Sequence, residues 1–281
     1  MNWTLVNDII DSTDYPVDVM TFKDDTLFVG IEGRGIYKKI DNNHWYKYPG
    51  TTYGLIPTHM TALQKDVYIG TEGQYFIGKA SSIGNLSLIF DSLDFNCNKS
   101  NSIRQMWVTK LLPASLEGSE VLLASNVVTN QFVLVISSSG INCFGTEGLS
   151  QEDIYYGAHD IAWKDDTLLA GTSGVVKKYV NNQWPVLGDS LPLTPQKFRP
   201  YATAIAVYGN RVFVGTNYVG VLEWKEGNGW NQVGDGLPRF SDGYYDAISY
   251  LVVFQGKLIA AYGSGKPWRS SGHGLYSNNL Q

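Results

Sequence analysis

A short phrase recurs along the chain and constrains its fold more than any other feature. Each copy consists of an apolar strand, a polar turn, a second apolar strand and a final small residue. Clear copies stand at 18–30, 59–70, 159–171 and 203–215, and looser ones at 121–125 and 257–261. Their final residues, 40 to 54 positions apart, are Gly30, Gly70, Ala124, Gly171, Gly215 and Ala261. Six units of about 47 residues predict a repeat architecture in which each unit packs on its neighbours.

Each unit continues in the same way after its small residue. A Gly-rich turn, a third short strand and a turn rich in Asn or Gly lead to an aromatic residue, which is Trp45, Trp184 or Trp230 in the clearest units. Four short strands in a unit of this length are typical of β-propeller blades. We therefore expect an all-β protein, a single six-bladed β-propeller domain over 1–281 with four-stranded blades.

The two ends of the chain fit a closed ring. The blades are expected at 13–50, 51–97, 98–150, 151–196, 197–240 and 241–281. The last unit has no tryptophan strand, whereas the first residues, Asn2-Trp3-Thr4-Leu5-Val6, supply one. We therefore expect residues 1–12 to complete the last blade, so that the N-terminal strand closes the ring and leaves no free sheet edge.

Composition narrows the classes of protein further. Charged residues are 17% of the chain, while 30 of 281 residues are Gly and 13% are aromatic, which fits short strands and tight turns. A net charge of −5 excludes a strongly basic nucleic-acid-binding protein. No apolar run could span a membrane, and no signal peptide is visible, so a cytoplasmic location is expected. Cys97 and Cys143 are too few for a disulfide framework and lack metal-site spacing.

One turn carries a resemblance to a known group of propellers. The segment Asp41-Asn42-Asn43-His44-Trp45 keeps a polar turn followed by tryptophan but lacks the leading serine of an Asp-box. The chain thus resembles degenerate Asp-box (BNR-like) repeat propellers. The resemblance implies the architecture and leaves function open, because the family includes glycosidases, lectins and assembly factors. Its sialidase branch would need clustered arginines, and only Arg34 falls in a face loop here.

The repeat register indicates which residues meet at one face of a propeller, around the central axis. The starts of the innermost strands are Asp18, His59, Trp107, His159, Thr203 and Tyr250. The neighbouring turns contribute Glu32, Glu72, Asn126, Ser173, Asn217 and Gly263. Two of the four histidines therefore occupy equivalent positions, with carboxylates near them.

Three interpretations of this ring of polar residues stay open. His59, His159 and Asp18 could ligate one divalent metal ion. Alternatively, a histidine acts as general base, Asp18 and Glu72 orient it, and Tyr250 donates a proton or stabilises an oxyanion. In the third interpretation, the histidines only bond neighbouring blades and fill the channel. The expected substrate-binding residues are Glu32, Trp107, Thr203, Asn217, Trp268 and Arg269.

Two further features lie near the same face. The long turn 262–274 contains Lys266, Trp268, Arg269 and His273, which suits a flap over a pocket, or else a solvated loop. Tyrosines precede several innermost strands and could rim the face, where such side chains bind sugars, aromatic ligands or protein partners. They are Tyr155, Tyr156, Tyr201, Tyr244 and Tyr245.

The face positions differ from blade to blade, which favours one asymmetric site over a repeated one. We therefore expect a small-molecule pocket on the axis with hydrolase- or lyase-type chemistry. A lectin that binds a glycan through its aromatic rim, or a protein-interaction scaffold, is the alternative, because a fold by itself fixes no function.

Overall fold

A computed structural model provides the structure of the chain. It describes residues 18–41, 44–49, 56–73, 75–80, 86–91, 106–127, 132–137, 140–237, 239, 243–262 and 274–280. These residues form 22 strands and one short helix, so the all-β prediction is confirmed. The chain divides into two compact units, Met1–Cys143 and Phe144–Gln281.

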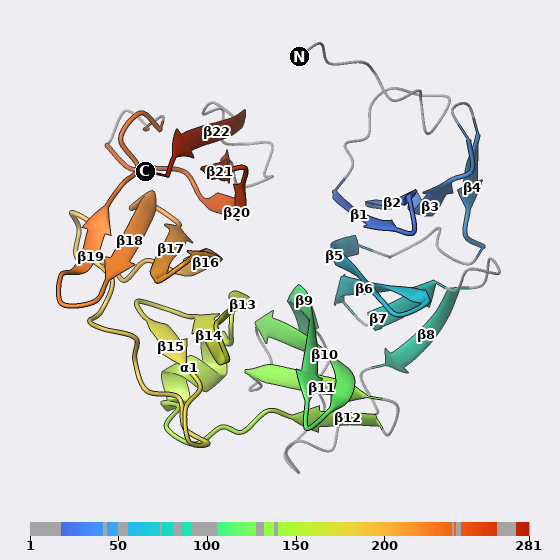
Figure 1. The fold of residues 1–281 in the computed structure, drawn as a ribbon, viewed down its shortest axis with the longest axis horizontal. Helices are drawn as coiled ribbons and strands as arrows, with labels where there is room; N and C mark the ends of the chain where they lie inside the picture. Colours follow the sequence, from blue (N-terminus) through green and yellow to red (C-terminus); the bar gives the residue numbers. More distant parts are fainter. Residues whose placement is uncertain are drawn as a thin grey trace. The chain divides into compact units, whose positions relative to one another are not determined.

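The first unit begins with a four-stranded antiparallel sheet in the order β1-β2-β3-β4 (Figure 1). Its strands are β1 (Val19–Lys23), β2 (Thr26–Ile31), β3 (Gly35–Lys39) and β4 (Trp45–Lys47). Short turns join β1 to β2 and β2 to β3, as the first repeat predicts.

An eight-stranded sheet makes up the rest of the first unit. Its strands are β5 (Ile56–Leu63), β6 (Asp66–Gly73), β7 (Tyr75–Ala80), β8 (Leu86–Asp91), β9 (Met106–Leu116), β10 (Ser119–Val127), β11 (Val133–Ser137) and β12 (Gly140–Cys143). The second and third repeats were expected as separate sheets. They are one sheet because the end of β6 pairs with the start of β9, with Glu72 opposite Trp107 and Gly73 opposite Met106.

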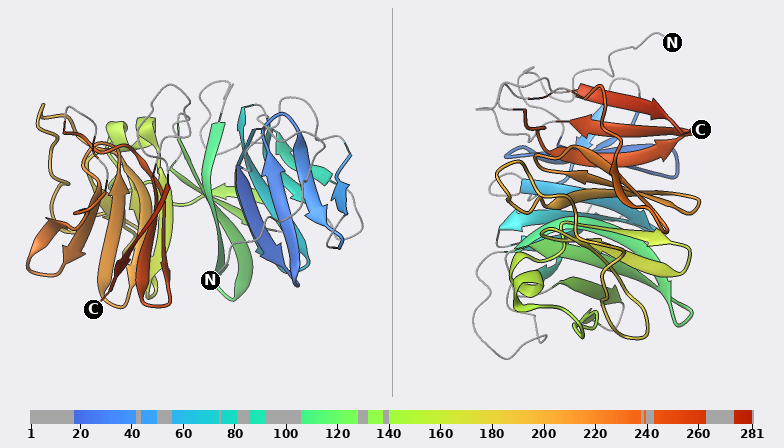
Figure 2. Two further views of the ribbon diagram at one scale, coloured as in Figure 1. Left: turned by 90° about the horizontal axis from the view of Figure 1, so that it is seen from above. Right: turned by 90° about the vertical axis from the view of Figure 1, so that its left-hand side faces the viewer.

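The second unit contains three antiparallel sheets, whose strands run side by side in Figure 2. The first has β13 (Asp160–Lys164), β14 (Thr167–Gly171) and β15 (Val176–Lys178). The second has β16 (Ala202–Tyr208), β17 (Arg211–Thr216), β18 (Val221–Lys225) and β19 (Gly229–Gln232). The third has β20 (Ile248–Phe254), β21 (Lys257–Tyr262) and β22 (Gly274–Asn279).

The glycine that ends the repeated phrase has a packing role. A Cβ on Gly171 would lie 2.6 Å from the carbonyl oxygen of Ala202, which begins the next sheet. A Cβ on Gly215 would lie 2.5 Å from a side-chain carbon of Ile248, again in the next sheet. The repeat therefore has a small residue where the first strand of the following sheet crosses it.

The apolar side chains of consecutive sheets pack together inside each unit. In the first unit, one buried cluster contains Val19, Phe28, Met60, Val67 and Ile69. In the second unit, two clusters lie between successive sheets, one with Leu169, Ala202, Ile205, Val212 and Val214 and the other with Ala204, Phe213, Ile248, Leu258 and Ala260. Burying these side chains is the main stabilising term for such sheets.

The helix α1 (Gln151–Tyr156) was not expected from the sequence. Ser150 caps its N-terminus, because its hydroxyl accepts the N–H of Asp153 while the Asp153 carboxylate accepts the N–H of Ser150. The segment Ser150-Gln151-Glu152-Asp153 is thus a capping box, which could have identified the helix.

The prediction of a closed six-bladed ring is only partly tested by the described residues. The sheets of the described chain number five, so six separate blades are not confirmed. Residues 1–17, which include the expected closing strand and Trp3, lie outside the described residues.

Candidate functional site

The site residues expected in the first unit are held by backbone contacts. The Asp18 carboxylate accepts the N–H of Glu32 at 2.6 Å, so these two expected neighbours are together. Glu72 and Trp107 are opposite each other in the β6–β9 pairing, and Trp107 is 40% exposed.

His59 is bonded to the neighbouring part of its sheet. Its Nδ1 accepts the N–H of Leu111 in β9 at 3.3 Å. Burial, and then the positive charge of Lys110, lower the pKa of His59 to about 3. The imidazole is therefore neutral at pH 7, and its Nδ1 is already used to satisfy backbone.

His159 has a different environment in the second unit. Its backbone N–H donates to the carbonyl of Gly171 at 2.8 Å, just before β13 begins. Burial lowers the pKa of His159 to about 4. Its ring lies 4.7 Å from the ring of Tyr201, while its Nε2 is buried without a hydrogen-bond partner among the described residues. An unsatisfied buried nitrogen is costly, so this atom is a candidate for bonding a ligand.

Thr203 and Asn217 hold the backbone around them. The Thr203 hydroxyl lies 2.7 Å from the carbonyl oxygen of Ile248 in the next sheet. The Asn217 side-chain oxygen accepts the N–H of Tyr201 at 2.6 Å. Both hydrogen bonds are made to backbone atoms, and both side chains are only partly buried.

Tyr250 lies near the carboxylate of Asp160, which the sequence analysis did not select as a site residue. Burial and the negative charge of Asp160 raise the pKa of Tyr250 to about 12, although 42% of the residue is exposed. The Asp160 carboxylate accepts the N–H of Ile205, in the next sheet, at 2.6 Å. Asp160, Thr203 and His59 thus make the same kind of contact. In each case the side chain hydrogen-bonds the backbone of the first strand in the following repeat.

The expected metal ligands are not all in one unit. His59 and Asp18 belong to the first unit and His159 to the second. Within the described ranges, no group of three His, Cys, Asp or Glu side chains could hold a metal ion. Trp268 and Arg269 lie outside the described residues, as do all residues from 263 to 273 of the expected flap. The catalytic roles of His59, His159, Asp18, Glu72 and Tyr250 stay predictions.

The structure brings together a row of aromatic rings on the second unit. Tyr155 and Tyr156 end α1, with ring centroids 5.1 Å apart, and Tyr156 lies 5.8 Å from Tyr201. Tyr201 in turn contacts His159. We call Tyr155, Tyr156 and Tyr201 the tyrosine row. Tyr155 is 64% and Tyr156 37% exposed, so both rings are available to a ligand.

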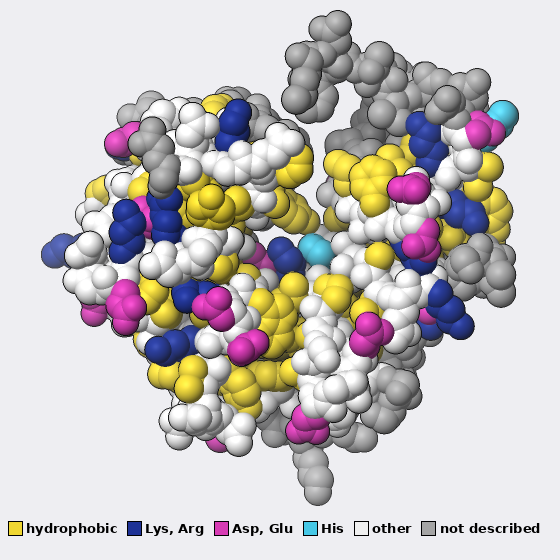
Figure 3. All heavy atoms as spheres, viewed as in Figure 1, with side chains coloured by type: hydrophobic (Ala, Val, Ile, Leu, Met, Phe, Trp, Pro, Cys, Tyr) yellow, Lys and Arg dark blue, Asp and Glu magenta, His cyan; other side chains and the backbone are white. Residues whose placement is uncertain are grey.

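A pocket of about 460 Å³ lies at α1, and we call it the α1 pocket. Its wall contains two ion pairs, Asp153 with Lys177 at 2.9 Å and Glu152 with Arg199 at 3.1 Å. The remaining lining residues are Ser150, Ser173, Gly174, Val175, Val186, Ser190, Leu191 and Leu193. Its volume is in the range of small-molecule sites. Figure 3 shows acidic and basic side chains interspersed over the face that it draws.

The buried carboxylate of Asp153, in the wall of the α1 pocket, is ionised. Burial raises the pKa of Asp153, but hydrogen bonds from Ser150 and Lys177 outweigh it, so the pKa lies below its usual value. The sequence interpretation missed Glu152, Lys177 and Arg199. A lysine in the third strand of a repeat, where an apolar residue is usual, was the available signal.

Among the described residues, no helix is long and apolar enough to cross a membrane. Cys143 is disulfide-bonded, and the only other cysteine of the chain is Cys97, outside the described residues.

Comparison with known proteins defines the class of the fold. No protein-family model and no curated protein matches the sequence. Solved structures do match, and these neighbours are propeller-like domains. The chain therefore has a propeller-like fold.

Three neighbours illustrate the likeness. The extracellular domain of BT4673 from B. thetaiotaomicron, described as a one component system, matches 93% of this chain with a TM-score of 0.65 and 11% identity. YCF48 bound to D1 peptide matches 98% of this chain, with a TM-score of 0.57 and 13% identity. A chain of the mitotic checkpoint complex matches 93% of it, with a TM-score of 0.58 and 13% identity. This chain spans 32% of the BT4673 chain, 81% of YCF48 and 76% of the checkpoint chain.

Proposed function

We propose that this protein is a binding module that holds a neutral, hydroxyl-rich ligand, a sugar or short glycan, in the α1 pocket and against the tyrosine row. The observation that carries the proposal is the pairing of charges in the pocket wall. Each cation there, Lys177 and Arg199, lies within 3.1 Å of a carboxylate. A site with paired charges gains little from a charged ligand, whereas it offers both donors and acceptors.

Hydroxyl groups suit such a wall because each one donates and accepts. Arg199 and Glu152 are about half exposed, so both can bond a ligand while still bonding each other. Ser150, Ser173 and Ser190 add hydroxyls to the same pocket.

The tyrosine row supplies the apolar part of the recognition. Sugar rings have apolar faces that stack on aromatic side chains, and Tyr155 and Tyr156 expose such faces beside the Glu152 turn of α1. The unpartnered Nε2 of His159 lies at the far end of the row, next to Tyr201. A ligand hydroxyl at that nitrogen would remove the cost of leaving it unsatisfied.

The fold neighbours are consistent with a binding role. One is an extracellular domain of a one component system, and another holds a peptide. A peptide ligand would instead indicate a scaffold, and such a protein would bind no sugar on a glycan array.

The proposal is tested with a glycan array followed by calorimetry on each hit. We expect one ligand per chain, and a loss of at least about tenfold in affinity for Tyr156→Ala and for Arg199→Ala. Tyr208→Ala is the control, because Tyr208 is 41% exposed in the same unit and lines neither the pocket nor the row. The proposal is wrong if no glycan binds, or if the three variants bind a glycan alike.

We also propose that the six repeats close into a six-bladed ring. The inner strands of the first and last described sheets support this, because each carries exposed apolar side chains. Met20 and Phe22 on β1 are 64% and 65% exposed, and Val252 and Phe254 on β20 are 53% and 58% exposed. In mid-chain the counterparts of Met20 and Val252 are Ile205 and Ala206, which are buried in the clusters between sheets, so a closed ring would cover Met20 and Val252 in the same way.

A further inference from the structure

The aromatic surface of the second unit continues past Tyr201 into the loops of the next two sheets. Tyr218 lies in the turn between β17 and β18, and Tyr244 lies just before β20, with ring centroids 5.7 Å apart. The N–H of Tyr245 donates to the carbonyl of Tyr218 at 3.1 Å, so backbone holds these two loops together. Asn217 joins the same turn to Tyr201, because its side-chain oxygen accepts the N–H of Tyr201 at 2.6 Å.

Tyr201 connects this region with the α1 pocket. Burial raises the pKa of its hydroxyl, and three neighbours raise it further: Tyr156, Glu152 and Tyr218. Glu152 lines the α1 pocket, whereas Tyr218 belongs to the following repeat. We call Tyr155, Tyr156, Tyr201, Tyr218 and Tyr244 the extended row.

The backbone of Tyr218 has a conformation that does not favour tyrosine. Its φ is 79°, in the left-handed region, and it is the third residue after the glycine that ends the repeated phrase. Two other repeats have glycine at this place, Gly33 with φ 67° and Gly174 with φ 77°. A bulky residue adopts such a φ at a cost that glycine does not have, and residues of this kind are concentrated at binding sites. A role for the Tyr218 ring in binding accounts for a tyrosine in a turn that glycine would form more easily.

The spacing and chemistry of the extended row suit a chain of sugars. Its three contacting pairs of tyrosine rings have centroids 5.1 Å, 5.8 Å and 5.7 Å apart, which is close to the length of one sugar unit in an extended glycan. Each tyrosine offers an apolar ring to a sugar face and a hydroxyl that both donates and accepts hydrogen bonds. The side chains of Tyr201, Tyr218 and Tyr244 are partly exposed, so a ligand can reach them.

We infer that the ligand is an unbranched oligosaccharide, and that Tyr218 and Tyr244 form a second subsite for its chain. A single sugar would occupy only the α1 pocket, whereas a longer chain would follow the row past Tyr201 to Tyr218. The inference rests on the proposed sugar-binding function and specifies the length of the ligand and its course over the protein.

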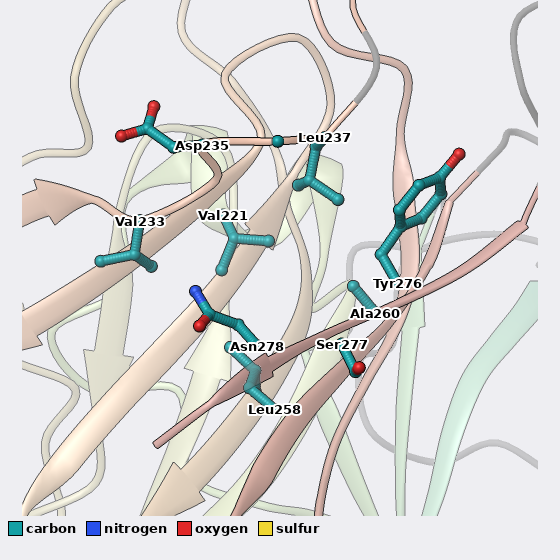
Figure 4. A pocket seen from close by; sticks show the side chains of 10 residues that line it. Val221, Val233, Asp235, Leu237, Leu258, Ala260, Tyr276, Ser277 and Asn278 are labelled. Atoms are coloured by element: carbon teal, nitrogen blue, oxygen red, sulfur yellow. The ribbon is translucent and has the colours of Figure 1, made fainter. Parts of the chain in front are cut away.

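A second pocket of the same unit provides the control. It has a volume of about 260 Å³ and lies at the last sheet (Figure 4). No residue of the extended row lines it, and the exposed Asn278 of β22 lies in its wall. Because an amide can bond a sugar hydroxyl, Asn278→Ala tests whether a glycan binds there instead. The apolar lining residues are Val221, Val233, Leu237, Leu258 and Ala260.

Calorimetry on the full-length protein with sugars of increasing length tests the inference. The probes are cello-, xylo- and malto-oligosaccharides, each from the monosaccharide to the hexasaccharide. We expect the hexasaccharide of the series that binds to be held at least about tenfold more tightly than its monosaccharide, because each further sugar contacts another aromatic side chain.

Tyr218→Gly removes the ring and keeps a residue suited to the turn, so its Tm should not fall below that of wild type. Its affinity for the hexasaccharide should fall about tenfold, while its affinity for the monosaccharide in the α1 pocket stays the same. Tyr244→Ala should show the same selective loss. Asn278→Ala should bind every length as wild type does.

The inference is overturned if monosaccharide and hexasaccharide bind alike, or if Tyr218→Gly weakens both equally or neither. It is also overturned if Asn278→Ala, in place of Tyr218→Gly, lowers the affinity for the longer chains. Binding of a polyproline peptide along the row in place of an oligosaccharide chain would count against it too, because aromatic grooves also bind such peptides. Each of these results is compatible with a single sugar in the α1 pocket, so the proposed function fails separately, when no glycan binds at all.

Discussion

At the scale of single residues, side chains at the starts of inner strands differ in what they bond. His59 accepts a backbone N–H from β9, Thr203 bonds a carbonyl of the next sheet, and His159 faces Tyr201 with an unpartnered nitrogen. The repeat register predicted that these positions are equivalent, but the observed pairing places Asp160, and not His159, at the position that corresponds to His59. It could not predict their partners, because these depend on the local path of the neighbouring strand.

The two buried histidines make stability depend on pH. Unfolded histidines bind a proton near pH 6.5, whereas the folded pKa values are about 4 for His159 and about 3 for His59. The unfolded state therefore binds more protons below pH 6.5, so stability is lost as the pH falls from there through 4. Urea unfolding should show about 2 kcal/mol lost per histidine between about pH 6.5 and pH 5.

The His159→Gln variant should lose less stability than wild type as the pH falls. The difference should equal the loss that one histidine causes. His44→Gln is the control, because the His44 side chain is 75% exposed and has no burial to lose. Equal slopes for wild type and His159→Gln would contradict the assignment.

At the scale of elements, the repeated strands could be predicted and the α1 pocket could not. Alternating apolar residues and the terminal glycine are local signals, and both agree with the sheets observed. The α1 pocket is built from residues 150–153, 173–177, 186–193 and 199, most of which are loops outside the repeated phrase. Loops between repeats vary freely, so their meeting point has no periodic signal.

The glycine that ends the phrase should tolerate no side chain. Gly171→Ala places a Cβ 2.6 Å from the carbonyl oxygen of Ala202, and backbone cannot move aside as a flexible side chain can. We expect a loss of about 3 kcal/mol in the free energy of unfolding, measured in urea. Gly209→Ala meets nothing within 4 Å and has only a positive φ to overcome, so it should cost about 1 kcal/mol. A smaller loss for Gly171→Ala than for Gly209→Ala would refute this role.

The helix α1 should depend on its buried ion pair more than on its cap. Ser150→Ala removes a capping hydroxyl and should cost about 1 kcal/mol. Asp153→Asn leaves the buried Lys177 without its carboxylate and should cost about 3 kcal/mol. Chemical denaturation of both variants measures their losses in the free energy of unfolding. A larger loss for Ser150→Ala than for Asp153→Asn would contradict the prediction. Because α1 carries Tyr155 and Tyr156, Asp153→Asn should also weaken ligand binding.

At the scale of the whole molecule, the disulfide bears on where the protein works. The sequence analysis predicted a cytoplasmic location, yet Cys143 is disulfide-bonded. Disulfides persist mainly in oxidising compartments. The finding does not favour the cytoplasm, and a count of two cysteines was too small to indicate it.

The disulfide predicts a measurable response to reductant. Intact mass under non-reducing conditions should be about 2 Da below the reduced mass, since both thiols have lost hydrogen. Reduction should lower the Tm of the protein, because the bond restricts the unfolded chain. Cys143→Ser is the matched variant, and its Tm should not respond to reductant. A wild-type Tm that reductant leaves unchanged would show that the bond contributes nothing to stability.

The pairing of β6 with β9 also limits how independent the second and third repeats are of each other. Glu72 and Gly73 of the second repeat are bonded to Trp107 and Met106 of the third, so the two repeats share one ladder. Loss or duplication of either repeat alone would leave the end of β6 or the start of β9 with unpaired backbone groups. Backbone bridges of the same kind join Ser173 to Tyr201 and Tyr218 to Tyr245 in the second unit, so neighbouring repeats are bonded through their backbones as well as through their apolar cores.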